Sequence, residues 1–496
     1  MTCDLSTLRE RGTHWWHQTV LFTGTGLAFG LILAFSILEY IPPFTAGIAF
    51  IAAALPMVLV WHAHAKKIFV GILVLSMTFI VDRTFNLHPE HMGGAKGFIV
   101  SLRDIALCFA LFVSFVESMH RKQMRVKFFP RFLLPLIGLL VMAVLSMGKA
   151  VFVSYSVYEF IEIVKAVITF LYIANYTARD ENYKYVIGFV LIGLGLEVIF
   201  VLLELVGSIH ITALGSRSAE YAADMRQDAY YRVGGTLGGA NPLAWYLDFV
   251  LPLALGMVFY KVRSIPRAFM VLLFCSGLAV LILTFSRGGW AGFIVSAMMI
   301  WFYYMRHSST LKKILVVIIT LTIIGGGILI VSTTDNAVKT RLTEDDKGSA
   351  YVRIPLMEVA ISIIKVNPVF GVGLNNYTVV YHQYDYGVDK ITYYYPVPVH
   401  NFFLQLAAET GIAGMAFFIL FIILVAIAGI RYSLTYTGRS AWAAFSIVAG
   451  SAGFFLQGLV ENTSLGSYNM YPLWIMYGLL AGITAREHKP GETDEP

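Results

Sequence analysis

A histidine late in the sequence has the setting of a general base. His400 follows Pro396 and Pro398 and directly precedes a long apolar run that begins at Asn401. The two prolines restrict the backbone and would hold the imidazole in place. Because an imidazole titrates near neutral pH, it can take a proton from a hydroxyl group. The pattern favours His400 as a base, and it also fits a histidine that only caps the helix expected after it.

A second candidate, Arg287, lies in the segment Ser286-Arg287-Gly288-Gly289 between two apolar runs. A guanidinium so close to hydrocarbon is costly without an anionic partner. Neighbouring glycines let the backbone come close to a ligand. The setting therefore favours an anion-binding arginine, and the alternative is an arginine that reaches outward to a lipid phosphate.

A third candidate, Arg232, precedes a glycine-rich turn that ends at Asn241-Pro242, before another apolar run. Backbone N–H groups exposed in such a turn, with an arginine beside them, would suit a phosphate. An arginine can also hold two phosphate oxygens with parallel hydrogen bonds. Arg232 and Arg287 together therefore predict a binding site for phosphate groups.

No segment has a strong metal-binding motif. His88, Glu90 and His91 have a spacing that fits one helical turn, but a proline interrupts them and no third strong ligand is near. The acidic pair Asp345-Asp346 lies in a segment rich in Lys, Thr and Gly, which is typical of a solvated loop. We therefore expect no metal at the site, and positive charge supplied by arginines instead.

Several ionisable residues fall inside or beside apolar runs. Glu159, Glu162 and Lys165 are spaced three residues apart and would share one helical face. Ionisable groups inside a membrane are functional candidates, although Glu162 and Lys165 also fit a structural pair. Three further acids are similar cases, and no proton path is predicted from any of them: Glu197, Glu204 and Glu461.

The elements that position these residues are membrane helices. Hydrophobic residues make up 58% of the 496 positions and charged residues 13%, against a soluble-protein norm of roughly 45–50% and 25%. A soluble chain of this length would need more polar surface to cover its core. The formal net charge of +6 does not indicate nucleic-acid binding, because the basic residues are scattered between apolar runs, where they anchor helix ends.

Apolar runs of about 20 residues predict an all-α polytopic transmembrane bundle with about twelve to fourteen spans. The predicted spans lie near residues 19–38, 42–61, 68–85, 98–118, 132–148, 157–177, 185–206, 243–260, 268–285, 289–305, 314–332, 401–429, 440–460 and 468–485.

The distribution of Lys and Arg predicts the orientation. Short segments dense in basic residues, such as 121–131, belong on the cytoplasmic side. Both termini are then cytoplasmic, and the long segments 207–242 and 332–400 lie on the outer side. Within the second, the stretch 354–366 predicts an amphipathic helix on the outer surface. All the candidate arginines and His400 fall on the outer side.

The motifs occur together in the order found in the O-antigen ligase and polymerase family of membrane glycosyltransferases, which this sequence resembles. The matching pieces are Arg232 with Asn241-Pro242-Leu243-Ala244, Ser286-Arg287-Gly288-Gly289, Tyr351-Val352-Arg353, Asn367-Pro368 with Gly371-Val372-Gly373-Leu374-Asn375-Asn376-Tyr377, and His400-Asn401-Phe402-Phe403-Leu404-Gln405 with Glu409-Thr410-Gly411. The motifs taken together are specific for this family, whereas each motif alone is weak evidence for it.

The resemblance implies an inverting, metal-independent glycosyl transfer without a cofactor at the periplasmic face of the inner membrane. The donor would be a glycan on undecaprenyl pyrophosphate, and the acceptor a hydroxyl of lipid A-core or a related molecule. His400 would be the catalytic base, and Arg232, Arg287 and Arg353 would bind the pyrophosphate. Residues 1–206 would be N-terminal transmembrane helices, 207–485 the catalytic membrane region and 486–496 a cytoplasmic tail.

Two other functions fit parts of the sequence. An O-antigen or exopolysaccharide polymerase of the same family differs only in its acceptor. A small-solute transporter, such as a bicarbonate transporter, would need polar residues continuous through the middle of the bilayer, and the spans carry few apart from 157–177. The tyrosines before His400 could stack on sugar rings or form an interfacial belt; they are Tyr381, Tyr384, Tyr386, Tyr393, Tyr394 and Tyr395.

Overall fold

The structure is a computed structural model of the chain, and the residues it describes are 62–120, 126–207, 232–262, 265–307 and 349–486. The predicted spans at 19–38, 42–61 and 314–332 lie outside the described residues, as does the pair Asp345-Asp346.

The described residues form helices and one small sheet. The helices are α3 His62–Leu75, α4 Leu102–His120, α5 Pro130–Ser146, α6 Val153–Thr177, α7 Asn182–Gly207, α9 Ala240–Tyr260, α10 Arg267–Leu283, α11 Arg287–His307, α14 Ser349–Val366, α15 Tyr377–Val380, α16 Ile391–Tyr394, α17 Phe402–Thr435, α18 Arg439–Gln457 and α19 Tyr471–Thr484. Short 3₁₀ helices are η1 Met147–Lys149, η2 Gly235–Leu237, η3 Tyr381–Tyr384 and η4 Tyr468–Met470. Strands β1 Asp82–Phe85 and β2 Phe98–Ser101 pair antiparallel.

The prediction of an all-α polytopic membrane fold is confirmed. Six helices among the described residues are long and apolar enough to cross a bilayer: α5, α7, α9, α11, α17 and α18. Helix α10 is apolar but shorter, and α6 covers the predicted span at 157–177 with 25 residues. The chain is therefore a multi-pass membrane protein.

The chain divides into two compact units. The first contains residues 1–73 and 103–125, and the second contains residues 74–102 and 126–496. In the first unit, α3 and α4 are joined by an ion pair of 2.9 Å between Lys66 and Glu117, and by the stacked rings of Phe69 and Phe109. The second unit contains every candidate site residue.

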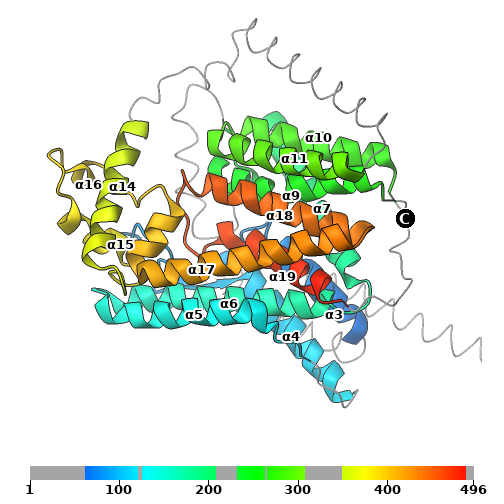
Figure 1. The fold of residues 1–496 in the computed structure, drawn as a ribbon, viewed down its shortest axis with the longest axis horizontal. Helices are drawn as coiled ribbons and strands as arrows, with labels where there is room; N and C mark the ends of the chain where they lie inside the picture. The colour runs from blue at the N-terminus through cyan, green and yellow to red at the C-terminus, as the bar shows by residue number, and fades with distance from the viewer. Residues whose placement is uncertain (1–61, 121–125, 208–231, 263–264, 308–348, 487–496) are drawn as a thin grey trace, which may run out of the picture. The chain divides into compact units, whose positions relative to one another are not determined.

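Small residues allow the helices of the second unit to pack closely. Helices α9, α11 and α18 lie against one another, while α5 lies along α17 and α6 along α19 (Figure 1). A Cβ added at Gly292 on α11 would stand 2.6 Å from the carbonyl oxygen of Gly453 on α18. A Cβ added at Gly478 on α19 would stand 2.7 Å from the carbonyl oxygen of Phe170 on α6. Close backbone approach of this kind is typical of helix packing within membranes.

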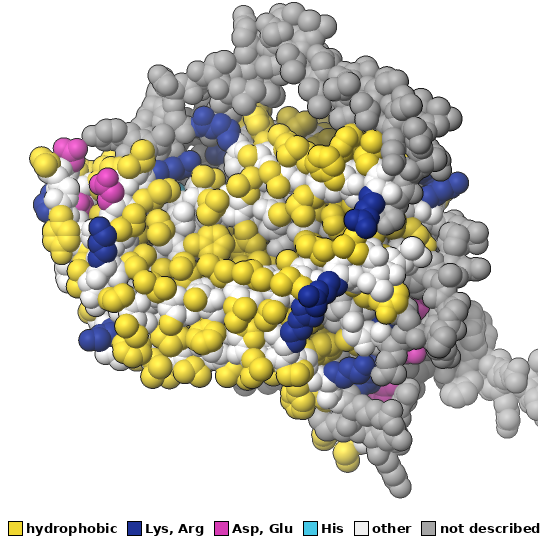
Figure 2. Space-filling model, viewed as in Figure 1, with side chains coloured by type: hydrophobic (Ala, Val, Ile, Leu, Met, Phe, Trp, Pro, Cys, Tyr) yellow, Lys and Arg dark blue, Asp and Glu magenta, His cyan; other side chains and the backbone are white. Residues whose placement is uncertain are grey.

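One face of the second unit is largely apolar. Hydrophobic side chains cover the middle of the face drawn in Figure 2, and the basic side chains on that face lie mainly toward the helix ends. Leu134 and Val141 of α5 and Ile423 of α17 are among the exposed side chains. Such a surface is unfavourable in water and suits contact with lipid.

The predicted spans at 68–85 and 98–118 are wrong in part. Helix α3 ends at Leu75, and Asp82–Phe85 is the strand β1. The second span begins as the strand β2, and its helix starts only at Leu102. Residues 86–97 between the strands contain a proline and three glycines, which disfavour a continuous helix, and the pairing of the strands satisfies their backbone groups instead.

The predicted helix at 354–366 is confirmed, and it is longer than expected. Helix α14 begins at Ser349, so Pro355 lies inside the helix rather than in its first turn. Val359 and Ile363 are buried in an apolar cluster with Tyr377, Tyr381 and Val399. This cluster fixes α14 close to the start of α17, where His400 lies.

Candidate active site

Glu461 is the centre of a network that joins three of the predicted site residues. Its Oε1 accepts hydrogen bonds from Asn241 Nδ2 at 3.1 Å and from Arg353 Nη2 at 3.5 Å. Its Oε2 lies 3.8 Å from Nδ1 of His400. The Glu461 side chain is only 15% exposed, whereas those of His400 and Arg353 are 30% and 29% exposed. The carboxylate therefore holds two half-buried, accessible functional groups in place.

Arg232 joins the same network through Asn241. Its Nη2 donates to Asn241 Oδ1 at 3.0 Å, and its Nε donates to the carbonyl oxygen of Thr284 at 2.9 Å. The second contact ties the guanidinium to the end of α10. Asn241 thus bridges Arg232 and Glu461 from the first turn of α9.

Arg287 lies beside this network as the first residue of α11. The next residue, Gly288, packs on the segment before Glu461: an added Cβ would stand 3.1 Å from Val460 Cγ2 and 3.3 Å from Gln457 Cγ. The segment that carries Arg287 also contains Thr284, the acceptor of the Arg232 hydrogen bond. The structure therefore brings the segments that carry Arg232, Arg287 and His400, and the side chain of Arg353 from α14, to residues 457–461.

The interpretation of His400 as a helix cap is wrong, because Asn401 fills that role. Asn401 is the N-cap of α17, and its side chain accepts a hydrogen bond of 2.9 Å from the backbone N–H of Leu404. Its Nδ2 also donates to the carbonyl oxygen of Leu459 at 3.1 Å. Nδ1 of His400 has no hydrogen-bond partner among the described residues. Residues 395–399, which directly precede His400, are neither helix nor strand.

The prediction that the glycine-rich turn offers its N–H groups to a phosphate is wrong for Gly234, Gly235 and Thr236. The N–H groups of Gly234 and Gly235 donate to Glu204, at 3.4 and 2.9 Å. Glu197 accepts from both the backbone N–H of Thr236, at 2.9 Å, and its hydroxyl, at 2.6 Å. Glu197 and Glu204 are seven residues apart on α7 and so share one face. These buried acids accept hydrogen bonds from the N–H groups of residues 234–236, and so fix the backbone that follows Arg232.

The Gly-x-Gly and Glu-Thr-Gly motifs contact each other and have a structural role. The N–H of Val372 donates to Ala408 at 2.9 Å, and that of Ile412 donates to Pro368 at 2.9 Å. Gly411 has a φ of +77°, which breaks the helical geometry of α17 at this point. The contact fixes the segment after α14 against the broken helix.

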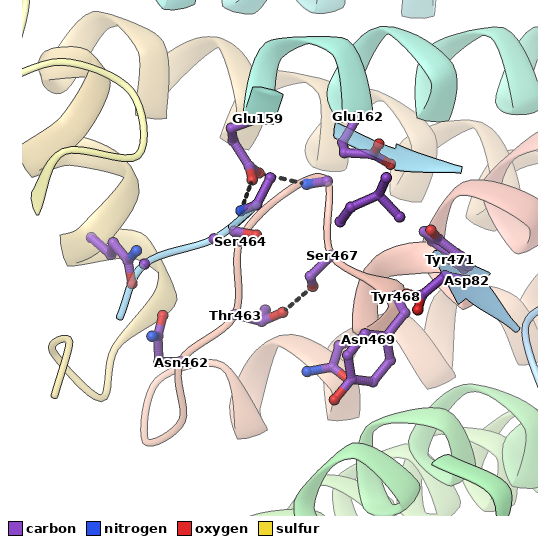
Figure 3. A pocket seen from close by; sticks show the side chains of 16 residues that line it. Asp82, Glu159, Glu162, Asn462, Thr463, Ser464, Ser467, Tyr468, Asn469 and Tyr471 are labelled. Carbon is purple, nitrogen blue, oxygen red and sulfur yellow. Dashed lines mark hydrogen bonds between the residues drawn. The ribbon is translucent and has the colours of Figure 1, made fainter. Parts of the chain in front are cut away.

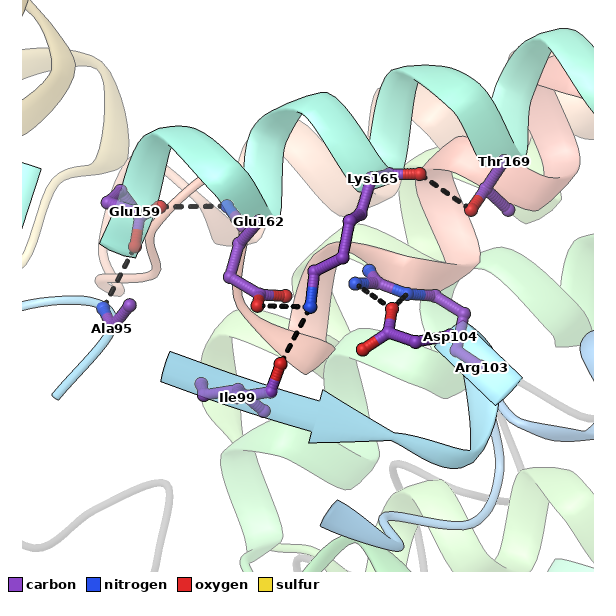
Figure 4. A network of polar contacts seen from close by, with 9 residues as sticks. Ala95, Ile99, Arg103, Asp104, Glu159, Glu162, Lys165 and Thr169 are labelled. Atoms are coloured by element: carbon purple, nitrogen blue, oxygen red, sulfur yellow. Dashed lines mark hydrogen bonds and ion pairs between the residues drawn. The ribbon is translucent and has the colours of Figure 1, made fainter. Parts of the chain in front are cut away.

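The ionisable residues of α6 are also engaged, as Figure 4 shows. Glu159 accepts hydrogen bonds of 2.9 Å from the N–H groups of Ala95 and Gly466. Lys165 lies 2.5 Å from Glu162 and donates to the carbonyl oxygen of Ile99 at 2.8 Å. The interpretation of Glu162 and Lys165 as a structural pair fits these contacts.

The three residues considered as metal ligands contact each other or neighbouring side chains. His91 Nε2 lies 2.9 Å from Asn375 Oδ1, and its ring stacks on Tyr155. Burial lowers the pKa of His91, which favours the neutral imidazole. His88 contacts Glu90 at 3.2 Å. Over residues 62–120 and the other described ranges, no group of three or more His, Cys, Asp or Glu residues is arranged to hold a metal ion.

The tyrosines before His400 divide into two sets. Tyr381 is buried in the apolar cluster under α14, where burial raises its pKa to about 12. Tyr384 packs against the same cluster, and its hydroxyl accepts a hydrogen bond of 3.0 Å from Asn367 Nδ2. Tyr386, Tyr393, Tyr394 and Tyr395 are each 47% or more exposed and are open to sugars or lipid headgroups.

The sequence alone did not single out Glu461 as part of the site. Glu461 is one of several acidic residues near apolar runs. No sequence pattern links it to His400 or Arg353, which lie 61 and 108 residues earlier. The available signal was its place at the end of a predicted span on the same side as His400.

Residues 268–419 match the family model described as O-antigen ligase. The match contains Arg287, Arg353 and His400, whereas Arg232, Asn241 and Glu461 lie outside it. No curated protein matches the sequence. The network around Glu461 therefore combines residues from the matched region with residues on both sides of it.

Proposed function

The chain belongs, through residues 268–419, to the O-antigen ligase and polymerase superfamily of membrane enzymes, and we propose that it is an O-antigen ligase-type glycosyltransferase. It transfers a glycan from undecaprenyl pyrophosphate to a hydroxyl of lipid A-core or a related acceptor. The reaction takes place at the periplasmic face of the inner membrane, inverts the anomeric centre and needs no metal.

The observation that carries this proposal is the convergence of Arg232, Arg353 and His400 on Glu461. A histidine oriented by a carboxylate is the arrangement that activates a hydroxyl nucleophile in many enzymes. Glu461 faces Nδ1, which leaves Nε2 of His400 to take the acceptor proton. Catalytic hydrogen bonds are often long before substrate binds, and the 3.8 Å separation fits that state.

The arginines stabilise the leaving group in this proposal. The acceptor oxygen forms a bond to the anomeric carbon as the bond from that carbon to the pyrophosphate oxygen breaks. The acceptor proton moves to His400, and the electron pair leaves on undecaprenyl pyrophosphate. Arg232, Arg287 and Arg353 neutralise the growing negative charge, with planar donors suited to phosphate oxygens.

The position of these residues favours an enzyme over a transporter. Arg287 begins α11, Asn241 lies in the first turn of α9, and His400 directly precedes α17. The candidate residues thus gather at helix ends, whereas a transport path would need polar groups at the middle of the bilayer.

Deletion of the gene and inspection of surface glycans tests the proposal. We expect lipid A-core without attached long chains, together with accumulation of long chains on undecaprenyl pyrophosphate. Cores that carry a single repeat unit would instead assign the protein as a polymerase. Unchanged surface glycans would contradict both assignments.

A further inference from the structure

A polar cavity of about 170 Å³ lies between α6, residues 93–99 and the segment 462–471 (Figure 3). At about 30 Å³ for each water molecule, it has room for about five or six waters, or for one small ring. It adjoins the network described above, because Asn462 directly follows Glu461. None of the proposed catalytic or pyrophosphate-binding residues lines it.

Several oxygen acceptors of this cavity have no partner in the part of the chain that the structure describes. They are Gln405 Oε1, Asn462 Oδ1, Ser464 Oγ and Asn469 Oδ1. Gln405 is 3% exposed, and its Nε2 donates to Glu409 at 3.1 Å. That bond orients the amide, whose oxygen has no partner among the described residues. Buried acceptors without a donor are unfavourable, so the cavity suits a ligand that donates hydrogen bonds.

The charges around the cavity define the ligand further. Asp82, Glu159 and Glu162 line it, and its lining contains no Lys, Arg or His. A phosphate or a sugar carboxylate would be repelled by these acids and would find no cationic partner. The hydroxyls of Thr463 and Ser467 are bonded to each other at 2.6 Å. The cavity therefore favours a ligand rich in O–H or N–H donors that carries no negative charge.

On this basis we propose that the cavity is a subsite for one neutral or amino-substituted sugar residue, whose donors pair with Gln405, Asn462 and Asn469. This inference rests on the proposed function, since it needs a glycan at the neighbouring site. Gln405 lies five residues beyond His400, in the first two turns of α17. The sugar would be either the donor residue next to the pyrophosphate or a residue of the acceptor, and both present the same hydroxyl chemistry.

Sugar binding to the purified full chain in nanodiscs tests the subsite. The probes are N-acetylglucosamine, glucosamine and glucuronic acid, observed by saturation-transfer difference NMR. We expect signals from the first two sugars and none from glucuronic acid. Asn462→Ala and Asn469→Ala should each weaken binding about tenfold, as expected for loss of one buried hydrogen bond. Gln383→Ala, which removes an exposed carboxamide of η3, should bind as the wild type does.

An isosteric variant keeps the test independent of folding. Asn469→Asp preserves side-chain shape and adds a negative charge, so it should increase the preference for glucosamine over N-acetylglucosamine. An equal change for both sugars would contradict the proposed site, as would binding of glucuronic acid by the wild type. Displacement of the bound sugars by CaCl₂ would contradict the sugar subsite. It would show that the unpaired oxygens of the cavity bind a cation instead, because Ca²⁺ also prefers such ligands.

Competition then identifies the source of the sugar. If the cavity holds a sugar of the donor, purified lipid-linked donor should remove the probe signal. If it holds a sugar of the acceptor, the core acceptor should remove that signal. A probe signal that neither molecule removes would overturn the subsite. His400→Ala provides the separation from the proposed function, since it should bind the probes normally. Probe binding without glycan transfer by the wild type would count against the proposed function alone. Transfer without probe binding would count against the subsite alone.

Discussion

Oε2 of Glu461 lies 3.8 Å from Nδ1 of His400. This is an ion-pair separation, longer than a hydrogen bond, and Nδ1 has no hydrogen-bond partner in the described ranges. The same carboxylate contacts Arg353, and Asn241 links it to Arg232. One side chain therefore relates the proposed base to two of the proposed pyrophosphate ligands.

Glu461→Gln should lower turnover by about 10²–10⁴-fold, because a neutral amide cannot stabilise the imidazolium formed when His400 takes a proton. The size of the side chain is kept, so the melting temperature should change little. The measurement is kcat for glycan transfer by purified protein. Glu358→Gln on the exposed side of α14 is the matched control and should be fully active. Wild-type turnover by Glu461→Gln would remove the carboxylate from the mechanism.

Asn401→Ala should destabilise the protein by about 1 kcal/mol, the usual effect of losing an N-cap. The variant also loses the contact with Leu459. The measurement is the free energy of unfolding, or the melting temperature, in detergent. His400→Ala should leave both unchanged, since Asn401 rather than His400 caps α17. A larger loss of stability in His400→Ala than in Asn401→Ala would reverse these two roles.

Gly235→Ala should lower the melting temperature and reduce activity. Gly235 has a φ of +53°, and the position of a Cβ there is occupied by the Glu197 side chain. An alanine would strain the backbone and displace the acid that holds the turn behind Arg232. Gly188→Ala on α7 is the control, because an added Cβ there meets nothing within 4 Å. Equal melting temperatures for the two variants would show that the turn tolerates rearrangement.

If the arginines stabilise the leaving group, transfer should proceed in excess EDTA at the same rate as without EDTA. Arg287→Lys should also be strongly impaired, because a point charge cannot reproduce the two parallel donors of a guanidinium. Both are measured in the same in vitro transfer assay. Loss of activity in EDTA that Mg²⁺ or Mn²⁺ restores would contradict the arginine account. It would direct attention to Asp345 and Asp346, which lie outside the described residues.

Local sequence features predicted the helices well where apolar runs were uninterrupted, as in α9 and α17. They failed at 82–85, where pairing with residues 98–101 decided the structure. Strand pairing depends on a partner that a single apolar run does not reveal. The start of α14 also depends on a distant partner. The helix begins before the predicted residue 354, because Val352 and Leu356 pack into an apolar cluster with Ile391.

For the site, residue type predicted which side chains could act but not what they contact. His400, Arg232 and Arg353 were identified from their settings and from the family resemblance. Glu461 and the buried partners of the glycine turn were not, because these contacts join residues separated by 30 to 220 positions. Only the fold brings such residues together.

The most direct test of the central claim is glycan transfer by purified His400→Ala with lipid-linked donor and core acceptor. The account predicts that kcat falls by about 10²–10⁴-fold, the usual contribution of a general base. Donor binding should be retained, because the arginines rather than His400 contact the pyrophosphate. Transfer by His400→Ala at close to the wild-type rate would contradict the assignment of His400 as the base.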